Sequence, residues 1–342
     1  MSITLKDVAN YAGVSMSTVS RVINQKGNIS EETVQKVEEA IATLMYKPSG
    51  TSELFRHQSY QIGVFAPGNS NLDDEGSRVI VDVSAVVSEI EKNGHIPLVT
   101  TLPSPQDVSN NRIFTKIENG EIDGVIICDF CDQDETKALC LKHNVPFINT
   151  NGIGLDPSES YVDYDNVDGA YQVIKHLHSL GHTHIGIIAG PEDHEITKNR
   201  LYGVYKAVED LKLDEKNIKT VFTPYTIEGG ECGARELVAK GDITAIFAFC
   251  DRQAISAMAT LKSMNYDIPK DISVVGFDDM EICSFVSPPL TSVKRYTSDI
   301  SPILFRSLID LIENKNIKKV QILYNTQLIQ RESTAPVSSR KK

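Results

Sequence analysis

Residues 4–24 read TLKDVANYAGVSMSTVSRVIN, a pattern of two short helices separated by a turn at Gly13. Thr4 precedes the first helix and Asp7 follows three residues later, which is the Thr-x-x-Asp form of a capping box. Gly13 ends this helix because glycine accepts the left-handed conformation that closes a helix. Ser15 is placed to cap the second helix. The stretch therefore predicts a helix-turn-helix.

The second predicted helix has one apolar face and one small, polar face. Its apolar residues recur at helical spacing and should point inward. A helix that reads DNA enters a major groove about 12 Å wide, so it needs short side chains, one forked cation for guanine, and hydroxyls or amides for phosphates. Those residue types lie on its outer face, which comprises Met16, Ser17, Ser20, Arg21 and Asn24. We therefore expect this face to bind DNA.

The stretch resembles the helix-turn-helix of the lactose-repressor (LacI) family of bacterial transcription regulators. The family pattern T-[IL]-x-D-V-A-x-x-A-G-V-S-x-x-T-V-S-R-V-[IL]-N is matched at every fixed position. The resemblance implies that Met16, Ser17 and Arg21 read base edges. It also places four residues for phosphate contacts: Thr4, Ser15, Thr18 and Asn24. The alternative interpretation is a helical hairpin that only caps another domain.

A third helix is expected after Ser30, and it ends at Tyr46-Lys-Pro48, which resembles the family's Tyr-x-Pro-Asn. Tyr46 therefore joins the candidate DNA-binding residues. The hinge that follows departs from the family, because Gly50 and Thr51 have poor helix propensity. By the resemblance, either Leu54 or Phe55 would insert into the minor groove and kink the duplex. The alternative is an ordinary linker whose two apolar residues pack on a dimer partner.

Charge is unevenly divided along the 342 residues. Residues 1–60 carry six basic and six acidic side chains, so the net charge of −12 falls entirely on the remainder. Residues 1–26 hold three basic side chains and one acidic one. An acidic body should limit indiscriminate DNA binding and leave phosphate attraction to the head. Since no signal core or membrane-spanning apolar run is evident, we expect a cytoplasmic protein.

From Gln61 onward, apolar strands alternate with helical segments, which indicates parallel sheets covered on both faces. The predicted strands are 62–66, 96–100, 125–128, 146–150, 185–189, 220–222, 245–249 and 273–277. The predicted helices are 78–93, 107–119, 134–143, 167–180, 198–211, 229–240, 253–264 and 298–314. The fold class expected is a small all-α head followed by a two-lobed α/β body, similar to the family's periplasmic-binding-protein-like body.

The expected domains follow from this division. They are a DNA-binding head (1–47), a hinge (48–60), a body for effector binding and dimerisation (61–336) and a flexible tail (337–342). Within the body we expect an N-lobe of about 61–162 and 293–322, and a C-lobe of about 163–290 and 324–336. The chain should cross between lobes near 161–165, 290–294 and 322–324.

Motifs in the body extend the resemblance over nearly the whole chain, and the family's effector-contacting positions fall on Asn151, Arg200, Tyr225, Asp251 and Asp278. Open α/β sheets bind ligands beyond the carboxyl ends of their strands. Arginine and carboxylate side chains suit the hydroxyls of a polyol, an asparagine both donates and accepts, and a tyrosine offers a flat stacking surface. The alternative for Arg200 and Asp278 is a structural ion pair.

Three positions depart from the family: Cys250 replaces a usual asparagine, Ser256 a common glycine and Arg295 a common glutamine. The loss of the amide at Cys250 indicates that the ligand is not the family's commonest sugar. Arg295 suggests an anionic effector such as a sugar phosphate. The alternative for Arg295 is a surface salt bridge.

Two clusters imitate metal sites. The spacing Cys128-x2-Cys131-x8-Cys140-x2-His143 resembles a zinc set, but Cys140 and His143 would lie about 15 Å back along the following helix. Four histidines crowd the end of the predicted helix 167–180, where cations complement the negative helix terminus: His176, His178, His182 and His184. We expect no metal and no cofactor.

These observations predict a sequence-specific DNA-binding transcriptional regulator, a repressor of carbohydrate-use genes. We expect a homodimer on a pseudo-palindromic operator, controlled by a sugar or sugar phosphate in the interlobe cleft. The chain lacks the serine-elbow, phosphate-loop and zinc-protease motifs, so an enzyme is not expected. The alternative is a sugar- or purine-binding module whose head docks a protein partner, for which binding should depend little on salt.

Overall fold

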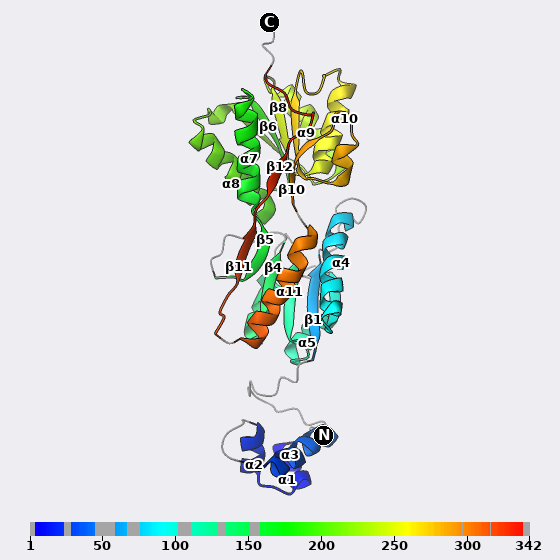
Figure 1. Ribbon diagram of the computed structural model, residues 1–342, viewed down its shortest axis with the longest axis vertical. Helices are drawn as coiled ribbons and strands as arrows, with labels where there is room; N and C mark the ends of the chain where they lie inside the picture. Colours follow the sequence, from blue (N-terminus) through cyan, green and yellow to red (C-terminus); the bar gives the residue numbers. More distant parts are fainter. Residues whose placement is uncertain are drawn as a thin grey trace. The chain divides into compact units, whose positions relative to one another are not determined.

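The computed structural model (Figure 1) describes residues 4–23, 29–44, 59–66, 76–101, 111–128, 134–150, 158–295, 297–314 and 316–337. The chain divides into two compact units, the head (Met1–Ser59) and the body (Tyr60–Lys342). Each unit has its own hydrophobic core.

The head contains three helices, α1 (Leu5–Ala12), α2 (Met16–Ile23) and α3 (Glu31–Leu44). Gly13 has a φ of 67°, the left-handed conformation expected of a residue that ends α1. The Asp7 carboxylate accepts hydrogen bonds from the Thr4 backbone N–H (2.8 Å) and hydroxyl (2.6 Å), and these bonds lower the pKa of Asp7. Side chains from all three helices form the core, which includes Val8, Ala9, Val19, Val22, Val37 and Ala40. The predicted helix-turn-helix is confirmed.

The N-lobe is a parallel sheet with helices on both faces. Its strand order is β11-β5-β4-β3-β1-β2. The strands are β1 (Gln61–Ala66), β2 (Ile96–Thr101), β3 (Gly124–Cys128), β4 (Phe147–Thr150), β5 (Tyr161–Tyr164) and β11 (Gln321–Tyr324). The helices are α4 (Gly76–Lys92), α5 (Arg112–Glu118), α6 (Asp134–Lys142) and α11 (Thr297–Glu313). Helices α4 and α11 pack with one face of the sheet, and α5 and α6 pack with the other.

The C-lobe has a similar arrangement with strand order β12-β10-β9-β8-β6-β7, in which β12 is antiparallel to β10 and the other pairs are parallel. The strands are β6 (Ile185–Ala189), β7 (Ile218–Phe222), β8 (Ala245–Ala248), β9 (Ser273–Asp278), β10 (Thr291–Lys294) and β12 (Gln327–Ile329). The helices are α7 (Asn166–Ser179), α8 (Glu195–Asp210), α9 (Ile227–Ala239) and α10 (Asp251–Ser263), with short 3-10 turns η2 (Glu215–Asn217) and η3 (Glu281–Ser284). Helices α7 and α8 cover one face of this sheet, while α9 and α10 cover the other.

The chain crosses between the lobes three times: after β5, after β10, and between β11 and β12. In Figure 1 the red ribbon of β11 runs on into β12 from one lobe to the other. All eight predicted strands are present, and the four further strands lie next to these crossings. One boundary is corrected, because β10 pairs with β9 and so residues 291–294 complete the C-lobe sheet. The predicted fold class is confirmed.

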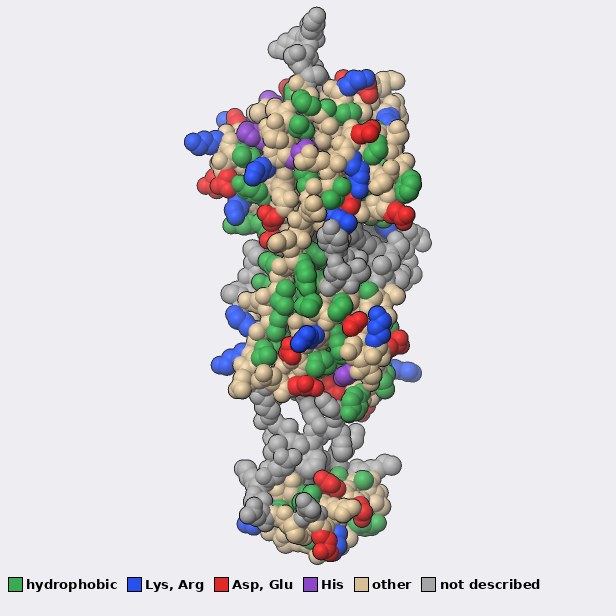
Figure 2. All heavy atoms as spheres, viewed as in Figure 1, with side chains coloured by type: hydrophobic (Ala, Val, Ile, Leu, Met, Phe, Trp, Pro, Cys, Tyr) green, Lys and Arg blue, Asp and Glu red, His purple; other side chains and the backbone are tan. Residues whose placement is uncertain are grey.

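No helix among the described residues is long and apolar enough to cross a membrane. Figure 2 shows acidic and basic side chains interspersed over the visible face of the body.

Candidate DNA-reading face and effector cluster

The N-terminal end of α2 carries a cluster of hydroxyls held in place by the cap. The Ser15 hydroxyl accepts from the Thr18 backbone N–H at 3.1 Å, which is the cap interaction expected of this residue. The same oxygen lies 2.7 Å from the Ser17 hydroxyl and 2.8 Å from the Thr18 hydroxyl. The cap therefore fixes both the start of the helix and the hydroxyls beside it.

The two faces of α2 differ as the sequence pattern predicts. Val19 and Val22 are buried in the head core. Met16 is half exposed, Arg21 is exposed with Ser17, and Ser20 is partly buried. The outer face thus presents one flexible apolar side chain, small hydroxyls and one guanidinium. These groups match the donors and apolar contacts that read base edges in a major groove.

Some of the predicted site residues lie outside the described residues: Asn24, Tyr46, Leu54, Phe55 and Asn151.

In the body, Arg200, Asp278 and Arg295 come together at the carboxyl ends of the C-lobe strands. Asp278 ends β9, Arg295 follows β10, and Arg200 lies on α8. Since β10, β9 and β8 are neighbours in the sheet, their carboxyl ends lie at one edge. We call these three residues the effector cluster. The N-lobe segments that follow β1 to β4 (67–75, 102–110, 129–133 and 151–157) are outside the described residues.

Arg200 is buried, with 2% of its surface exposed. Its Nε donates to Asn166 Oδ1 at 3.0 Å, and its Nη1 donates to the Phe249 carbonyl. The guanidinium stacks over the Phe277 ring with Cζ 3.7 Å from the centroid. Burial lowers the pKa of Arg200, and Asp278 opposes that shift. The partners therefore fix the guanidinium in one orientation.

Asp278 lies between two guanidiniums. Its Oδ1 is 3.8 Å from Arg200 Nη2 and 3.2 Å from Arg295 Nε. The Arg295 guanidinium carbon also lies 5.3 Å from the ring centroid of Tyr164, on N-lobe strand β5. Only 6% of the Arg295 side chain is exposed. The salt bridge considered for Arg295 exists, but it is buried and not at the surface.

Tyr225 lies in the same lobe, with its ring against the backbone at Gly190. A Cβ added to Gly190 would stand 2.0 Å from Tyr225 Cζ. The Tyr225 hydroxyl bonds the buried Thr197 hydroxyl at 2.7 Å, and the His194 ring centroid lies 6.2 Å away. Burial raises the pKa of Tyr225, so the phenol is neutral. A side chain at position 190 would therefore collide with the Tyr225 ring.

Asp251 belongs to the interior of the C-lobe. It has no exposed surface, and its carboxylate accepts from the Ser292 hydroxyl (2.5 Å) and the Met280 N–H (2.7 Å). Both carboxylate oxygens thus accept hydrogen bonds from within the C-lobe. We therefore do not propose Asp251 as an effector-binding residue. Cys250 is the N-cap of α10, and burial raises the pKa of its thiol to about 12, so it is a neutral group.

Asn166, Phe277 and Tyr164 were not predicted as site residues, although they position the two arginines. Asn166 and Phe277 stand inside motifs that the sequence does contain, Asp165-Asn and Gly276-Phe-Asp. Their proximity to Arg200 depends on the packing of α7, α8 and β9, which no local pattern reveals.

The cysteines and histidines whose spacing resembles metal sites contact other parts of the protein. Cys128 and Cys140 pack in separate hydrophobic clusters, on opposite faces of the N-lobe sheet. His182 Nε2 donates to the Ala335 carbonyl at 3.0 Å, and His176 Nε2 lies 3.0 Å from the Thr334 hydroxyl. The described residues hold no group of three metal-ligating side chains, and Cys131 is outside them.

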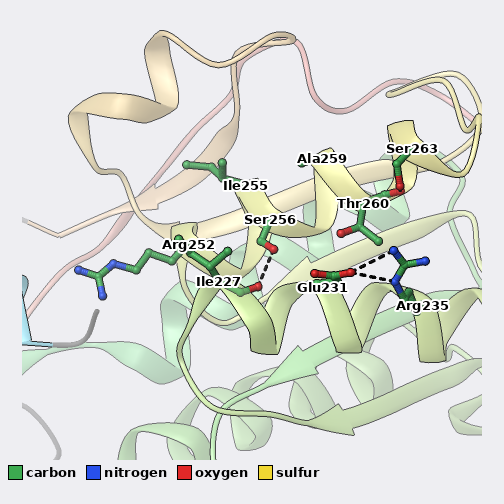
Figure 3. Close-up of a pocket in the computed structure, with 9 residues that line it drawn as sticks. All are labelled: Ile227, Glu231, Arg235, Arg252, Ile255, Ser256, Ala259, Thr260 and Ser263. Carbon is green, nitrogen blue, oxygen red and sulfur yellow. Dashed lines mark hydrogen bonds and ion pairs between the residues drawn. The ribbon is translucent and has the colours of Figure 1, made fainter. Parts of the chain in front are cut away.

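A shallow apolar hollow of about 510 Å³ lies between α9 and α10 (Figure 3). The Ser256 hydroxyl donates to the Ile227 carbonyl at 2.5 Å and ties the two helices together. An ion pair between Glu231 and Arg235 (3.0 Å) lines one side. Its lining is Ile227, Glu231, Arg235, Arg252, Ile255, Ser256, Ala259, Thr260 and Ser263.

Apolar side chains project from the same lobe close to α10. Phe285 is 74% exposed, Ile282 is 47% exposed and Ile227 is 51% exposed. The Lys262 ammonium of α10 donates to the Ser287 carbonyl, so the segment bearing Phe285 is attached along this helix. We call the hollow together with Ile282 and Phe285 the apolar face of the C-lobe. Exposed apolar side chains gathered on one face can mark an interaction surface.

Two family models match the chain. Residues 4–49 match bacterial regulatory proteins of the lacI family, and residues 174–334 match a periplasmic binding protein-like domain. Among curated proteins, the transcriptional regulator CelR of Thermobifida fusca is 28% identical over 335 residues, covering 96% of this chain and 98% of CelR. The regulator MalR of Streptomyces coelicolor is 27% identical, covering 98% of this chain and 97% of MalR.

Solved structures show the same similarity over the full length. A CelR–cellobiose complex has a TM-score of 0.72 at 29% identity, covering 97% of this chain and 99% of that one. A Lac repressor dimer bound to operator and an anti-inducer has a TM-score of 0.71 at 28% identity, covering 98% and 100% respectively.

Proposed function

Because this chain belongs to the LacI family of bacterial regulatory proteins and is a DNA-binding transcriptional regulator, we propose that it is a repressor of carbohydrate-use genes controlled by a sugar-like effector. The observation that carries this proposal is the outer face of α2. There Arg21 and the capped hydroxyls of Ser15 and Ser17 are exposed together on a well-packed helix. Relatives solved with operator DNA and with cellobiose support the two halves of the proposal.

In this mechanism α2 enters the major groove of an operator. The forked guanidinium of Arg21 binds N7 and O6 of a guanine, and Met16 makes an apolar contact with a thymine methyl. Thr4, Ser15 and Thr18 bind phosphates and fix the position of the helix on the duplex. Asn24 and Tyr46 would add contacts, and Leu54 or Phe55 would insert into the minor groove.

The body sets how strongly the head binds. An effector that contacts Arg200, Asp278 and Tyr225, with Asn151 from the N-lobe, would favour one arrangement of the lobes. Its effect on operator affinity equals its difference in affinity for the two arrangements. Relief of repression follows when the effector prefers the arrangement that binds DNA poorly.

The apolar face of the C-lobe suits a second copy of the chain. It pairs an apolar hollow with projecting apolar side chains, which is what a two-fold symmetric interface requires of one surface. A dimer would present two heads to the two half-sites of a pseudo-palindromic operator. The Lac repressor similar to this chain was solved as a dimer on its operator.

The first experiment selects duplexes from a random pool with the full-length protein and measures binding by fluorescence anisotropy. We expect a pseudo-palindromic consensus, and a steep loss of affinity between about 50 mM and 200 mM salt from released counterions. Equal affinity for every duplex, or no DNA binding, would contradict the proposal.

The Arg21→Ala substitution tests the reading face itself. Without the guanidinium, we expect discrimination at one guanine in each half-site to weaken by about 1–3 kcal/mol. Lys36→Ala is the matched control, because Lys36 is exposed on α3, pairs with Glu32 and carries the same charge. The control should change affinity equally for all duplexes. Unchanged base preference in Arg21→Ala would show that α2 does not read this guanine.

A further inference from the structure

We propose that Gln253 is a positioning residue whose side-chain amide sets where the Tyr225 ring lies. The inference rests on the proposed function, because Tyr225 is one of its candidate effector-binding residues. The role of Gln253 follows from three hydrogen bonds and not from a sequence motif.

Gln253 lies in the first turn of α10 and has no exposed surface. Its Nε2 donates to the Ala189 carbonyl at 3.1 Å, the Thr223 hydroxyl at 2.9 Å and the Pro224 carbonyl at 3.0 Å. A backbone carbonyl only accepts, so the amide nitrogen must face these groups. The amide oxygen then lies toward Cys250, 3.5 Å from its Sγ. The hydrogen bonds therefore fix the amide in one orientation.

The three acceptors stand at the ends of two neighbouring strands. Ala189 is the last residue of β6, while Thr223 and Pro224 directly follow β7, which ends at Phe222. The two strands are parallel, and Ala189 is paired with Phe222. One side chain from α10 therefore joins the carboxyl ends of β6 and β7.

The same two strand ends lead to the Tyr225 ring and to the backbone that it contacts. Gly190 follows Ala189, and Tyr225 follows Pro224. A Cβ at position 190 would lie 2.0 Å from Tyr225 Cζ, which shows how closely the ring approaches this backbone. Each side of that contact is one residue away from an acceptor of Gln253. A shift of either strand end would therefore change the contact.

Helix α9 packs closely on the same segment. A Cβ added to Gly230 would lie 2.4 Å from the Gln253 carbonyl oxygen, and one added to Gly229 would lie 2.1 Å from the Pro224 carbonyl oxygen. The two glycines therefore allow the helix to approach both backbones. The Gln253 amide and α9 together restrain the segment that carries Tyr225.

Loss of the amide nitrogen would remove a buried donor from the Pro224 carbonyl and the Thr223 hydroxyl. A buried polar group that loses its partner is costly, so the segment should shift to find another one. The Tyr225 hydroxyl is bonded to the Thr197 hydroxyl of α8 at 2.7 Å, which holds the far end of the ring. We therefore expect the ring to tilt and to remain inside the lobe.

Fluorine NMR of the full-length protein labelled with 3-fluorotyrosine tests this expectation. The chain has 12 tyrosines, and the Tyr225 resonance is identified by its loss in Tyr225→Phe. Gln253→Met keeps the length of the side chain and removes its donors. We expect the Tyr225 resonance to shift by more than its linewidth in this variant. An unchanged Tyr225 resonance in folded Gln253→Met would overturn the inference.

Two further variants make the result specific. Thr223→Val removes one of the three acceptors with little change of shape, so it should shift the same resonance by less. This variant decides the question if Gln253→Met does not fold. Gln172→Met is the matched control, because the Gln172 amide also bridges two segments of the C-lobe, donating to the Thr326 carbonyl at 3.2 Å. An equal shift in the control would contradict a specific role for Gln253.

These outcomes are separable from failure of the proposed function, because the NMR experiment uses neither DNA nor a ligand. Operator selection that succeeds while the Tyr225 resonance stays in place would overturn the role of Gln253 and leave the regulator intact. A protein that binds no DNA would overturn the proposed function, and the shift of the resonance would still decide whether Gln253 positions the ring.

Discussion

At the scale of single residues, the absence of a side chain at Gly190 makes room for Tyr225, a candidate effector-binding residue. The Tyr225 ring occupies the space where a Cβ of residue 190 would stand. Such a Cβ would lie 2.0 Å from Tyr225 Cζ and 2.3 Å from the Tyr225 hydroxyl oxygen. Tyr225 is nearly buried and bonded to Thr197, so it has little room to retreat. The platform proposed for the effector thus depends on a residue that makes no polar contact with it.

We expect Gly190→Ala to lower the free energy of unfolding of the body by about 1–3 kcal/mol, because an added methyl in a packed interior forces displacement. Denaturant unfolding followed by circular dichroism measures the change. Gly63→Ala on β1 is the matched control, since its Cβ would meet its neighbours at ordinary distances of 3.4 Å or more. Equal stabilities for the two variants would mean that Tyr225 moves freely.

The sequence predicted part of the candidate effector cluster. Its motif positions drew attention to Arg200 and Asp278, whose side chains the fold brings to 3.8 Å from different elements. Their roles toward a ligand remain predictions. The burial of Arg295 beside Tyr164 was not predictable, because β5 and β10 belong to different sheets and meet only through the crossing of the chain.

At the scale of elements, Asp251 joins α10 to its neighbours. It is the first residue of α10, and its carboxylate accepts from Ser292 on β10 and from Met280 just before η3. Burial, and then the charge of Asp278, raises its pKa from 3.8 to about 7. One titratable group therefore joins the start of α10 to β10 and to the segment between β9 and η3.

This raised pKa predicts a pH dependence of stability. Between pH 3.8 and about 7 the folded chain holds a proton on Asp251 that the unfolded chain has lost. The contribution of Asp251 to folding stability therefore decreases as pH rises through this range. In Asp251→Asn, the thermal midpoint should fall less between about pH 5 and pH 8 than in wild type. Asp310→Asn, on the exposed side of α11, should keep the wild-type slope; parallel slopes for all three proteins would contradict the assignment.

Two of the four strands that were not predicted, β11 and β12, depend on pairing with strands that do not precede them directly in the sequence. Strand β11 alternates between exposed and half-buried residues, and β12 has only three residues, so neither has the apolar run that marked the eight predicted strands. They are ordered because β11 pairs with β5 and β12 pairs with β10. Their hydrogen bonds come from partners that a local pattern does not show.

At the scale of the whole molecule, the apolar face of the C-lobe predicts self-association. Phe285→Glu places a charge on this face, and burying an unpaired charge in an interface is costly. We expect the variant to sediment as a monomer and to lose the steep dependence of operator binding on two half-sites.

Phe222→Glu is the matched control for this prediction. Phe222 is 43% exposed on the edge strand β7 of the same lobe and is not among the residues that line the α9–α10 hollow. It should remain a dimer in sedimentation velocity. Monomers in both variants, or dimers in both, would refute the assignment of the interface.

The three crossings of the chain also determine the order in which its domains can be completed during synthesis. The N-lobe sheet includes β11 and the C-lobe sheet includes β12. Neither sheet can therefore be complete until the chain has been synthesised past about residue 320. The helices of the head precede all of this, and domains generally fold as units from the N-terminus during synthesis. A nascent chain would thus possess the three helices of its head well before either lobe of its body is complete.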